Sequence, residues 1–207
     1  MDGIIKKLES EKLLPLYTVT DMELLNNVEE VLLNNNLSFI EITYRSEYAS
    51  KAIKYLADSG NLIVGAGTVR NLETAKDAIE NGAQFIVMPG LNEEVIEYCI
   101  EHNILVVPGA VTPTEIMKAQ ELGIKTVKFF PADVYGGIET IKSLSGPFYD
   151  VKFIPTGGIN EANYLEYLNV DAISAVGGSF IISEKMFKDS SINPNDYINN
   201  LVKGILK

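Results

Sequence analysis

Eight short apolar segments recur along the chain, and their spacing constrains the fold more than any other feature of the sequence. They follow one another roughly every 20 to 26 residues, which is about the length of one strand plus one helix. The segments are 13–19, 38–43, 62–66, 85–88, 104–107, 126–130, 151–154 and 171–176. Runs that are apolar almost throughout are typical of parallel strands, which are buried on both faces.

The segments between these runs carry signals for the starts and ends of helices. At Thr112-Pro113-Thr114-Glu115 a capping Thr precedes a Pro and, three residues on, a Glu, which is a capping-box pattern. Asn71, Asn92 and Asn160 are candidate caps for three other helices.

Eight strand–helix units predict an α/β fold, a (β/α)8 TIM barrel spanning residues 1–207 as one domain. An open doubly wound sheet is the competing arrangement, but no GxGxxG motif follows the first apolar run. In a barrel the functional groups are expected at the carboxyl ends of the strands.

Composition excludes several classes of function. The chain has 17 Lys+Arg against 28 Asp+Glu, a net charge of −11, which argues against nucleic acid as a partner. One His and one Cys cannot form the common zinc sites or a disulfide, and we expect His102 to be a surface residue at a helix end. No secretory signal or membrane span is visible. We therefore expect a cytoplasmic protein without a metal site.

Lys128 is the first candidate for chemistry. It lies inside an apolar run, between Val127 and Phe129, whereas most other lysines lie in polar helical segments. Burial disfavours a charged ammonium, and a neutral amine can attack a carbonyl. A structural Lys that extends to the rim of the strand is the alternative. Lys152 is a natural comparison, because it lies at the start of its strand.

Glu41, Thr43 and Arg45 share one face of a strand if that strand stays regular. A carboxylate beside a reactive Lys can move protons, and an Arg suits a substrate carboxylate. The alternative is a buried structural ion pair between Glu41 and Arg45.

Glycine-rich turns follow three of the runs, at 65–68, 155–158 and 176–179. The loops after the seventh and eighth strands are the usual phosphate site of a barrel. Glycines let backbone N–H groups approach an anion, and a following helix N-terminus favours negative charge.

Together these segments resemble the 2-keto-3-deoxy-6-phosphogluconate (KDPG) aldolase family of class I, Schiff-base aldolases. The resemblance covers nearly the whole chain in order. It comprises Glu41 and Arg45, GAGTV (65–69), MPG (88–90), PGAVTPTE (108–115), KFFPA (128–132), PTGGI (155–159) and GGS (177–179).

The resemblance implies a role for each site residue. Lys128 would form the imine with pyruvate or the keto acid, and Glu41 would shuttle protons. Arg45, Thr68 and Thr156 would contact the substrate and its carboxylate, and Phe130 would pack against its apolar side. The phosphate cradle would comprise Gly157, Gly158, Gly178 and Ser179. The family is usually a homotrimer that acts on a keto acid phosphate without a cofactor.

Two segments depart from the family's usual form, with Tyr44-Arg45-Ser46 in place of Leu-Arg-Thr and Asp133 in place of Glu. The predicted reaction is cleavage of KDPG to pyruvate and glyceraldehyde 3-phosphate, with 4-hydroxy-2-oxoglutarate as a further substrate.

Three alternatives stay open: an aldolase for the galactonate epimer, a non-aldolase phosphate-binding barrel enzyme, and a barrel that senses a sugar phosphate. The Asn34–Asn36 run has no assigned role.

Overall fold

Parallel strands and helices alternate along the chain in a computed structural model that describes residues 2–206. Each expected apolar segment contains or overlaps one strand. The strands are β1 (Leu13–Tyr17), β2 (Phe39–Thr43), β3 (Ile63–Gly67), β4 (Phe85–Val87), β5 (Leu105–Val107), β6 (Thr126–Phe129), β7 (Lys152–Pro155) and β8 (Val176–Gly178). The two ends of the domain expected over 1–207 lie outside the described residues.

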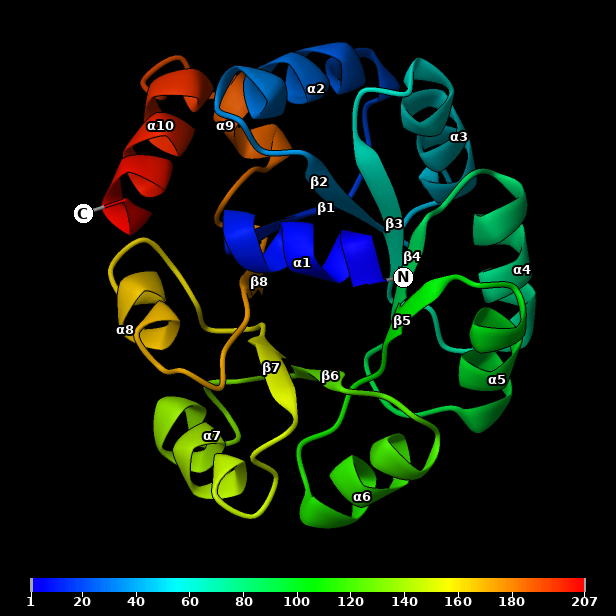
Figure 1. Cartoon of the computed structure of the whole chain (residues 1–207). Helices are drawn as coiled ribbons and strands as arrows, with labels where there is room; N and C mark the ends of the chain where they lie inside the picture. Colours follow the sequence, from blue (N-terminus) through cyan, green and yellow to red (C-terminus); the bar gives the residue numbers. More distant parts are fainter. Residues whose placement is uncertain (1, 207) are drawn as a thin grey trace.

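The helices surround the strands, except that α1 lies across their centre in the view of Figure 1. The helical elements are α1 (Asp2–Glu11), η1 (Met22–Leu24), α2 (Leu25–Asn34), α3 (Ala49–Ser59), α4 (Leu72–Glu80), α5 (Glu93–Glu101), α6 (Pro113–Glu121), α7 (Gly137–Ser145), α8 (Tyr164–Leu168), α9 (Glu184–Lys188) and α10 (Pro194–Ile205).

The strands do not form the closed eight-stranded TIM barrel that the spacing predicts, and that prediction is wrong. Six strands form a parallel half-barrel in the order β5-β4-β3-β2-β1-β8, while β6 and β7 form a separate two-stranded sheet. Single bridges join the two sheets, at Gly109–Lys128, Phe153–Ile173 and Thr156–Gly177.

The break between the sheets has a local cause on each side. On one side β5 ends before Pro108, which has no N–H to continue a ladder with β6. On the other side β8 begins only at Val176, so little of it lies opposite β7. The strand expected over 171–176 is displaced accordingly, to Val176–Gly178.

Two apolar cores lie on opposite faces of the strands. The outer core packs strands against the surrounding helices. The inner core brings together side chains from both sheets, including Phe39 of β2 and Ile154 of β7, and Leu8 of α1 joins them. Helix α1 therefore covers the amino ends of the strands and leaves the carboxyl ends accessible.

The expected helix starts are mostly confirmed. Thr112 and Glu115 form a complete capping box at α6. Asn71 accepts from the Thr74 amide and Asn92 from the Val95 amide. Asn160 is not the cap of α8, which is Asn163; Asn160 instead stabilises the turn before it, accepting from the Ala162 amide at 2.9 Å.

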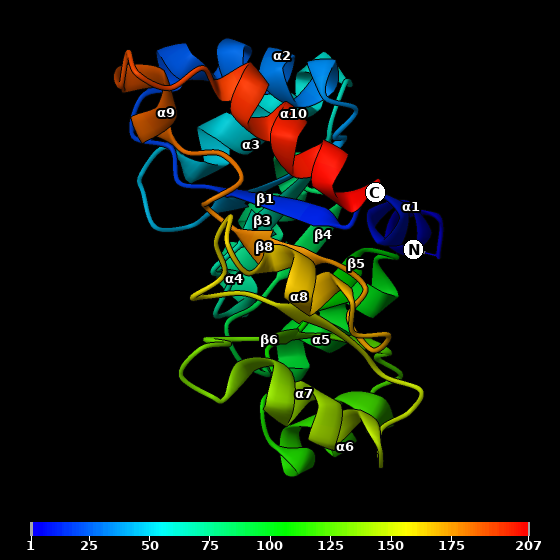
Figure 2. The same ribbon diagram turned by 90° about the vertical axis from the view of Figure 1, so that its left-hand side faces the viewer.

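Asn35 has a structural role that the sequence did not indicate. It is 2% exposed, and its amide donates to the Val31 carbonyl and to Asn195 of α10 and accepts from Asn199. These bonds tie the end of α2 to α10, which lie side by side in Figures 1 and 2.

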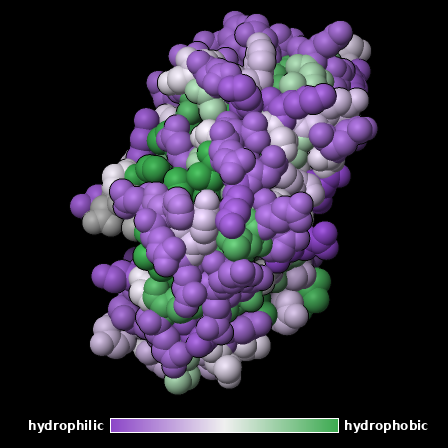
Figure 3. All heavy atoms as spheres, turned by 90° about the vertical axis from the view of Figure 1, so that its right-hand side faces the viewer, coloured by the Kyte–Doolittle hydropathy of each residue, from purple (hydrophilic) through white to green (hydrophobic). Residues whose placement is uncertain are grey.

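One face of the molecule is largely polar. The face in Figure 3, which is the side that carries α4 and α5, is mostly hydrophilic with small separate apolar patches. Within residues 2–206, no helix has both the length and the apolar character that crossing a membrane requires.

Candidate active site

Lys128 is the only buried lysine among the residues that the structure describes, with 5% of its surface exposed. In the register of β6 and β7 it lies opposite Ile154, an inner-core residue, so its side chain faces inward. Lys152, by contrast, is exposed at the start of β7, where it donates to the Asp171 carbonyl. The contrast between the two lysines that the sequence suggested is therefore present in the structure.

Glu41 is the ionic partner of Lys128. Its Oε1 atom lies 3.6 Å from Lys128 Nζ, and Glu41 is 1% exposed. Neither carboxylate oxygen has a hydrogen-bond partner among the described residues. Burial raises the pKa of the Glu41 carboxyl above its usual value, while Lys128 and then Arg45 oppose that shift. An unpartnered carboxyl with a raised pKa beside an amine can exchange protons with a bound substrate.

The alternative of a structural ion pair between Glu41 and Arg45 is wrong. The strand β2 ends at Thr43, and Arg45 lies in the following turn with its side chain exposed. Arg45 Nε donates to Thr43 Oγ1 at 3.3 Å, and Thr43 Oγ1 lies 2.7 Å from Thr18 Oγ1. Arg45 is thus located at the carboxyl end of the half-barrel, above Glu41 rather than paired with it.

Tyr44, where the chain departs from the family pattern, points to the other face of this turn. Its hydroxyl donates to Asp77 of α4 at 2.6 Å, and Asp77 also accepts from Ser50. These bonds hold the turn that carries Arg45 against the outer helices.

Gly67 is a site residue whose role the sequence analysis missed. It lies opposite Thr43 in the register of β2 and β3. A Cβ atom at this position would come within 1.9 Å of Glu41 Oε1. The absence of a side chain at Gly67 therefore creates the space that the Glu41 carboxylate occupies, a relation that only the register of the two strands reveals.

The structure brings the other candidate side chains to the same end of the strands. Thr68 follows β3 and has φ 59°, a left-handed conformation that is rare and costly for a β-branched residue. Thr156 is buried and bridges to Gly177. The Phe130 ring lies with its centroid 5.2 Å from Lys128 Nζ and is partly exposed.

The two glycine loops expose backbone amides at this end. Gly157 and Gly158 have φ 92° and 75°, values that favour glycine. Their carbonyls accept hydrogen bonds, Gly157 from the Asp133 amide and Gly158 from Asn163. Among the described loop hydrogen bonds, none uses the amide of Gly157, Gly158 or Ser179 as a donor. These amides are therefore available to an anion.

The expected helix N-termini do not support these loops directly. The helices that follow, α8 and α9, begin only at Tyr164 and Glu184 and have 5 residues each. An anion here would be held by loop amides rather than by a helix dipole.

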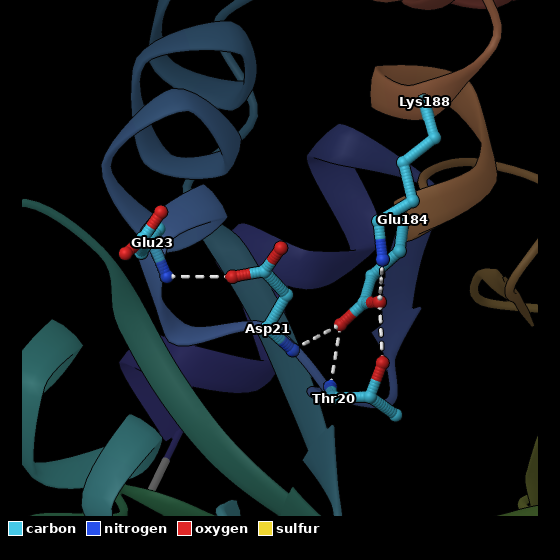
Figure 4. A network of polar contacts seen from close by, with 5 residues as sticks. All are labelled: Thr20, Asp21, Glu23, Glu184 and Lys188. Atoms are coloured by element: carbon cyan, nitrogen blue, oxygen red, sulfur yellow. Dashed lines mark hydrogen bonds and ion pairs between the residues drawn. The ribbon is translucent and has the colours of Figure 1, made fainter.

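Glu184 connects the loop after β1 to the segment after β8, as Figure 4 shows. Its carboxylate accepts from the Thr20 hydroxyl at 2.6 Å, from the Thr20 amide, from the Asp21 amide at 2.8 Å and from Lys188 at 3.0 Å. Burial alone would raise the Glu184 pKa, but the bonds from Thr20, Lys188 and Asp21 outweigh it and lower that pKa to about 2.

His102 is exposed at the end of α5, where Nδ1 lies 2.8 Å from the Tyr98 carbonyl oxygen, as expected of a surface residue. No cluster of three or more His, Cys, Asp or Glu side chains suited to a metal occurs among residues 2–206.

Comparison with known proteins identifies the family. A family model described as KDPG and KHG aldolase matches residues 4–197. The chain belongs to the KDPG and KHG aldolase family. It is therefore an aldolase, a carbon–carbon lyase.

Relatives within this aldolase family match four fifths of the chain or more. The 2-dehydro-3-deoxy-phosphogluconate aldolase of Haemophilus influenzae is 38% identical over 204 residues, which cover 98% of this chain and 95% of the relative. The KHG/KDPG aldolase of Escherichia coli K12 is 37% identical over 81% of this chain and 79% of the relative.

A solved KDPG aldolase from Legionella pneumophila supports the class I assignment. It is 32% identical with a TM-score of 0.89 and covers 97% of each chain. In that structure pyruvate was captured at low pH as a covalent carbinolamine intermediate. Carbinolamine formation is the chemistry of a Schiff-base aldolase, so the chain is a class I aldolase, and the non-aldolase and sensor alternatives are set aside.

Proposed function

We propose that Lys128 forms the Schiff base with a 2-keto acid and that Glu41 moves the protons of the reaction. The observation that carries this proposal is the buried pair itself, with Lys128 Nζ 3.6 Å from Glu41 Oε1 at the carboxyl end of the strands. Lys128 is the one described lysine shielded from water, and Glu41 has two unpartnered oxygens beside it.

The reaction then proceeds in balanced steps. Glu41 takes a proton from the Lys128 ammonium, and the resulting neutral amine attacks C2 of the keto acid to form a carbinolamine. Glu41 then gives that proton to the C2 hydroxyl, which leaves as water, so that a protonated imine and the Glu41 carboxylate remain. Glu41 accepts the proton of the C4 hydroxyl while the C3–C4 bond breaks and its electron pair moves toward the imine nitrogen. An aldehyde leaves, and an enamine of pyruvate remains on Lys128. Protonation at C3 and addition of water at C2 then release pyruvate and restore the amine.

The substrate we propose is KDPG, which would yield pyruvate and glyceraldehyde 3-phosphate, with 4-hydroxy-2-oxoglutarate as a second substrate yielding glyoxylate. Arg45, Thr68 and Thr156 would hold the substrate and its carboxylate, with Phe130 against its apolar side. The phosphate would accept from the loop amides at Gly157, Gly158, Gly178 and Ser179. Because the whole chain has a net charge of −11, such local donors are what make an anionic substrate bind.

The galactonate epimer is the weaker alternative. The relatives described above carry the gluconate name, and the resemblance associates a Thr at position 156 with that epimer. Parallel cleavage assays of the two epimers test this choice. A cytoplasmic location, a homotrimeric assembly and a single domain stay predictions.

The decisive experiment is borohydride reduction in the presence of pyruvate, followed by peptide mass spectrometry. We expect one pyruvate-derived adduct, on Lys128. Lys128→Ala should form no adduct and cleave no substrate, and the matched control Lys152→Ala should do both normally. An adduct on another lysine, or full turnover by Lys128→Ala, would overturn the assignment.

A further inference from the structure

We propose that Thr43 and Thr18 are positioning residues that aim the Arg45 guanidinium at the substrate carboxylate. The inference rests on the proposed function, because it takes Arg45 as the carboxylate contact. It adds two residues that never touch the reacting atoms and that act through Arg45.

The first observation is the chain of hydroxyl contacts beneath Arg45. Thr43 is completely buried at the end of β2. Its Oγ1 atom accepts from Arg45 Nε at 3.3 Å and lies 2.7 Å from Thr18 Oγ1. A hydroxyl has one proton to donate and two lone pairs, so Thr43 can accept from Arg45 while it donates to Thr18.

The register of the strands explains why the two hydroxyls meet. Tyr17, the last residue of β1, is paired with Ile42 of β2. The residues that follow them, Thr18 just after β1 and Thr43 at the end of β2, therefore lie side by side. Thr43 faces the same way as Glu41, two residues earlier. The two hydroxyls therefore lie between Glu41 and Arg45 at the carboxyl end of the half-barrel.

The second observation concerns which guanidinium atoms remain free. Among the described residues, no hydrogen bond or salt bridge involves either Nη atom of Arg45. Because Nε is bonded to Thr43, the guanidinium has its two Nη groups free to donate hydrogen bonds. A carboxylate can accept from both of them in a bidentate contact.

The third observation is that Glu184 holds the loop that carries Thr18. Thr18 lies just before Thr20 and Asp21, whose backbone amides donate to Glu184. Figure 4 shows these bonds, which hold the loop after β1 against the segment after β8. The Gly178-Ser179 turn of the proposed phosphate cradle lies at the start of that segment. An exposed Arg side chain has many rotamers, and fixing its Nε lowers the entropy lost when a carboxylate binds.

The test separates the hydroxyl of Thr43 from its shape. Thr43→Val keeps the branched side chain and removes the hydroxyl, whereas Thr43→Ser keeps the hydroxyl. For Thr43→Val we expect the KM for KDPG, and the pyruvate concentration that gives half-maximal borohydride trapping, to rise about tenfold. We expect kcat to change less than about threefold and Thr43→Ser to restore the wild-type KM, because the orientation of Arg45 affects binding more than bond cleavage.

A double-mutant cycle with Arg45→Gln distinguishes this inference from the proposed function. If Thr43 acts through Arg45, Thr43→Val should have little further effect on KM in the Arg45→Gln background. Thr18→Val should raise KM less than Thr43→Val and add little to it.

Two outcomes would overturn the inference alone. One is an Arg45→Gln variant with raised KM beside a Thr43→Val variant with unchanged KM. The other is an equal effect of Thr43→Val in both backgrounds. An unchanged KM in Arg45→Gln would instead refute the proposed role of Arg45 and the inference with it. Circular dichroism and thermal unfolding verify that each variant is folded.

Discussion

The Lys128 ammonium lies 3.6 Å from the Glu41 carboxylate, although β6 and β2 belong to different sheets. Three strands, β3, β4 and β5, lie between β2 and β6 in the chain, yet both side chains face the inner core. The pair depends on the sheets curving toward each other across that core. At this separation it is an ion pair without a direct hydrogen bond, and both Glu41 oxygens are left without a hydrogen-bond partner among the described residues.

Glu41→Gln should lower kcat about 100- to 10,000-fold, because the amide cannot accept and return a proton. Trapping of pyruvate on Lys128 should persist in part. In the wild-type enzyme, kcat/KM should fall at acid pH through a midpoint above 4.5, the ordinary pKa of a Glu carboxyl, because burial raises the Glu41 pKa. The carboxylate form is lost as the pH falls through that raised pKa, and Glu41→Gln should lack this acid limb. A variant with wild-type turnover would make Glu41 structural.

Gly67→Ala should displace the Glu41 carboxylate, since the new Cβ would lie 1.9 Å from Oε1. We expect kcat to fall at least about tenfold, because a small misplacement of a catalytic group costs that much or more. Gly90→Ala is the matched control, because a Cβ there meets nothing within 4 Å and activity should be retained. Equal activity of the two variants, measured by the pyruvate released, would contradict this role for Gly67.

Gly158→Ala should discriminate between phosphorylated and unphosphorylated substrates. Gly158 has φ 75°, and a Cβ there would lie 2.3 Å from Asp133 Cβ, so the loop must shift. We expect the KM for KDPG to rise about tenfold or more through lost amide contacts. The KM for 4-hydroxy-2-oxoglutarate, which has no phosphate, should change little. An equal rise for both substrates would argue against a phosphate cradle at this loop.

Glu184 should make the protein sensitive to acid. Its pKa is about 2 in the folded protein, against 4.5 as the ordinary value, so the unfolded chain binds this proton first as the pH falls. The stabilisation is present above about pH 5 and is lost toward pH 2, with a magnitude of about 2 kcal/mol after allowing for solvent screening.

Urea unfolding between pH 7 and pH 3 measures this contribution. Glu184→Gln should be less stable than wild type at pH 7 and should lose less stability on acidification. Glu139→Gln, at a side chain 88% exposed, should follow the wild-type curve. Parallel pH curves for Glu184→Gln and wild type would show that this carboxylate does not contribute.

The positions of the strands could be predicted from the sequence because burial on both faces leaves a nearly continuous apolar run. The same reasoning located Lys128, since a lysine inside such a run is unusual, and the capping box at Thr112, since that motif is local. Whether the eight strands close into one barrel could not be predicted from the sequence, because closure depends on how far each short strand extends beside its neighbour. Pro108 and the late start of β8 decided that the ladder is interrupted.

The sequence left the partner of Glu41 open between the reactive Lys and Arg45. Alternation along a regular strand allowed an ion pair with Arg45, but β2 ends at Thr43 and Arg45 lies in the following turn with its side chain exposed. Thus the sequence by itself determined the order of the elements, the family and the set of candidate groups, because these depend on local pattern. Only the tertiary structure decided which groups meet, because contacts such as Glu41 with Lys128 and Gly67, or Thr18 with Thr43, depend on register and on the approach of two separate sheets.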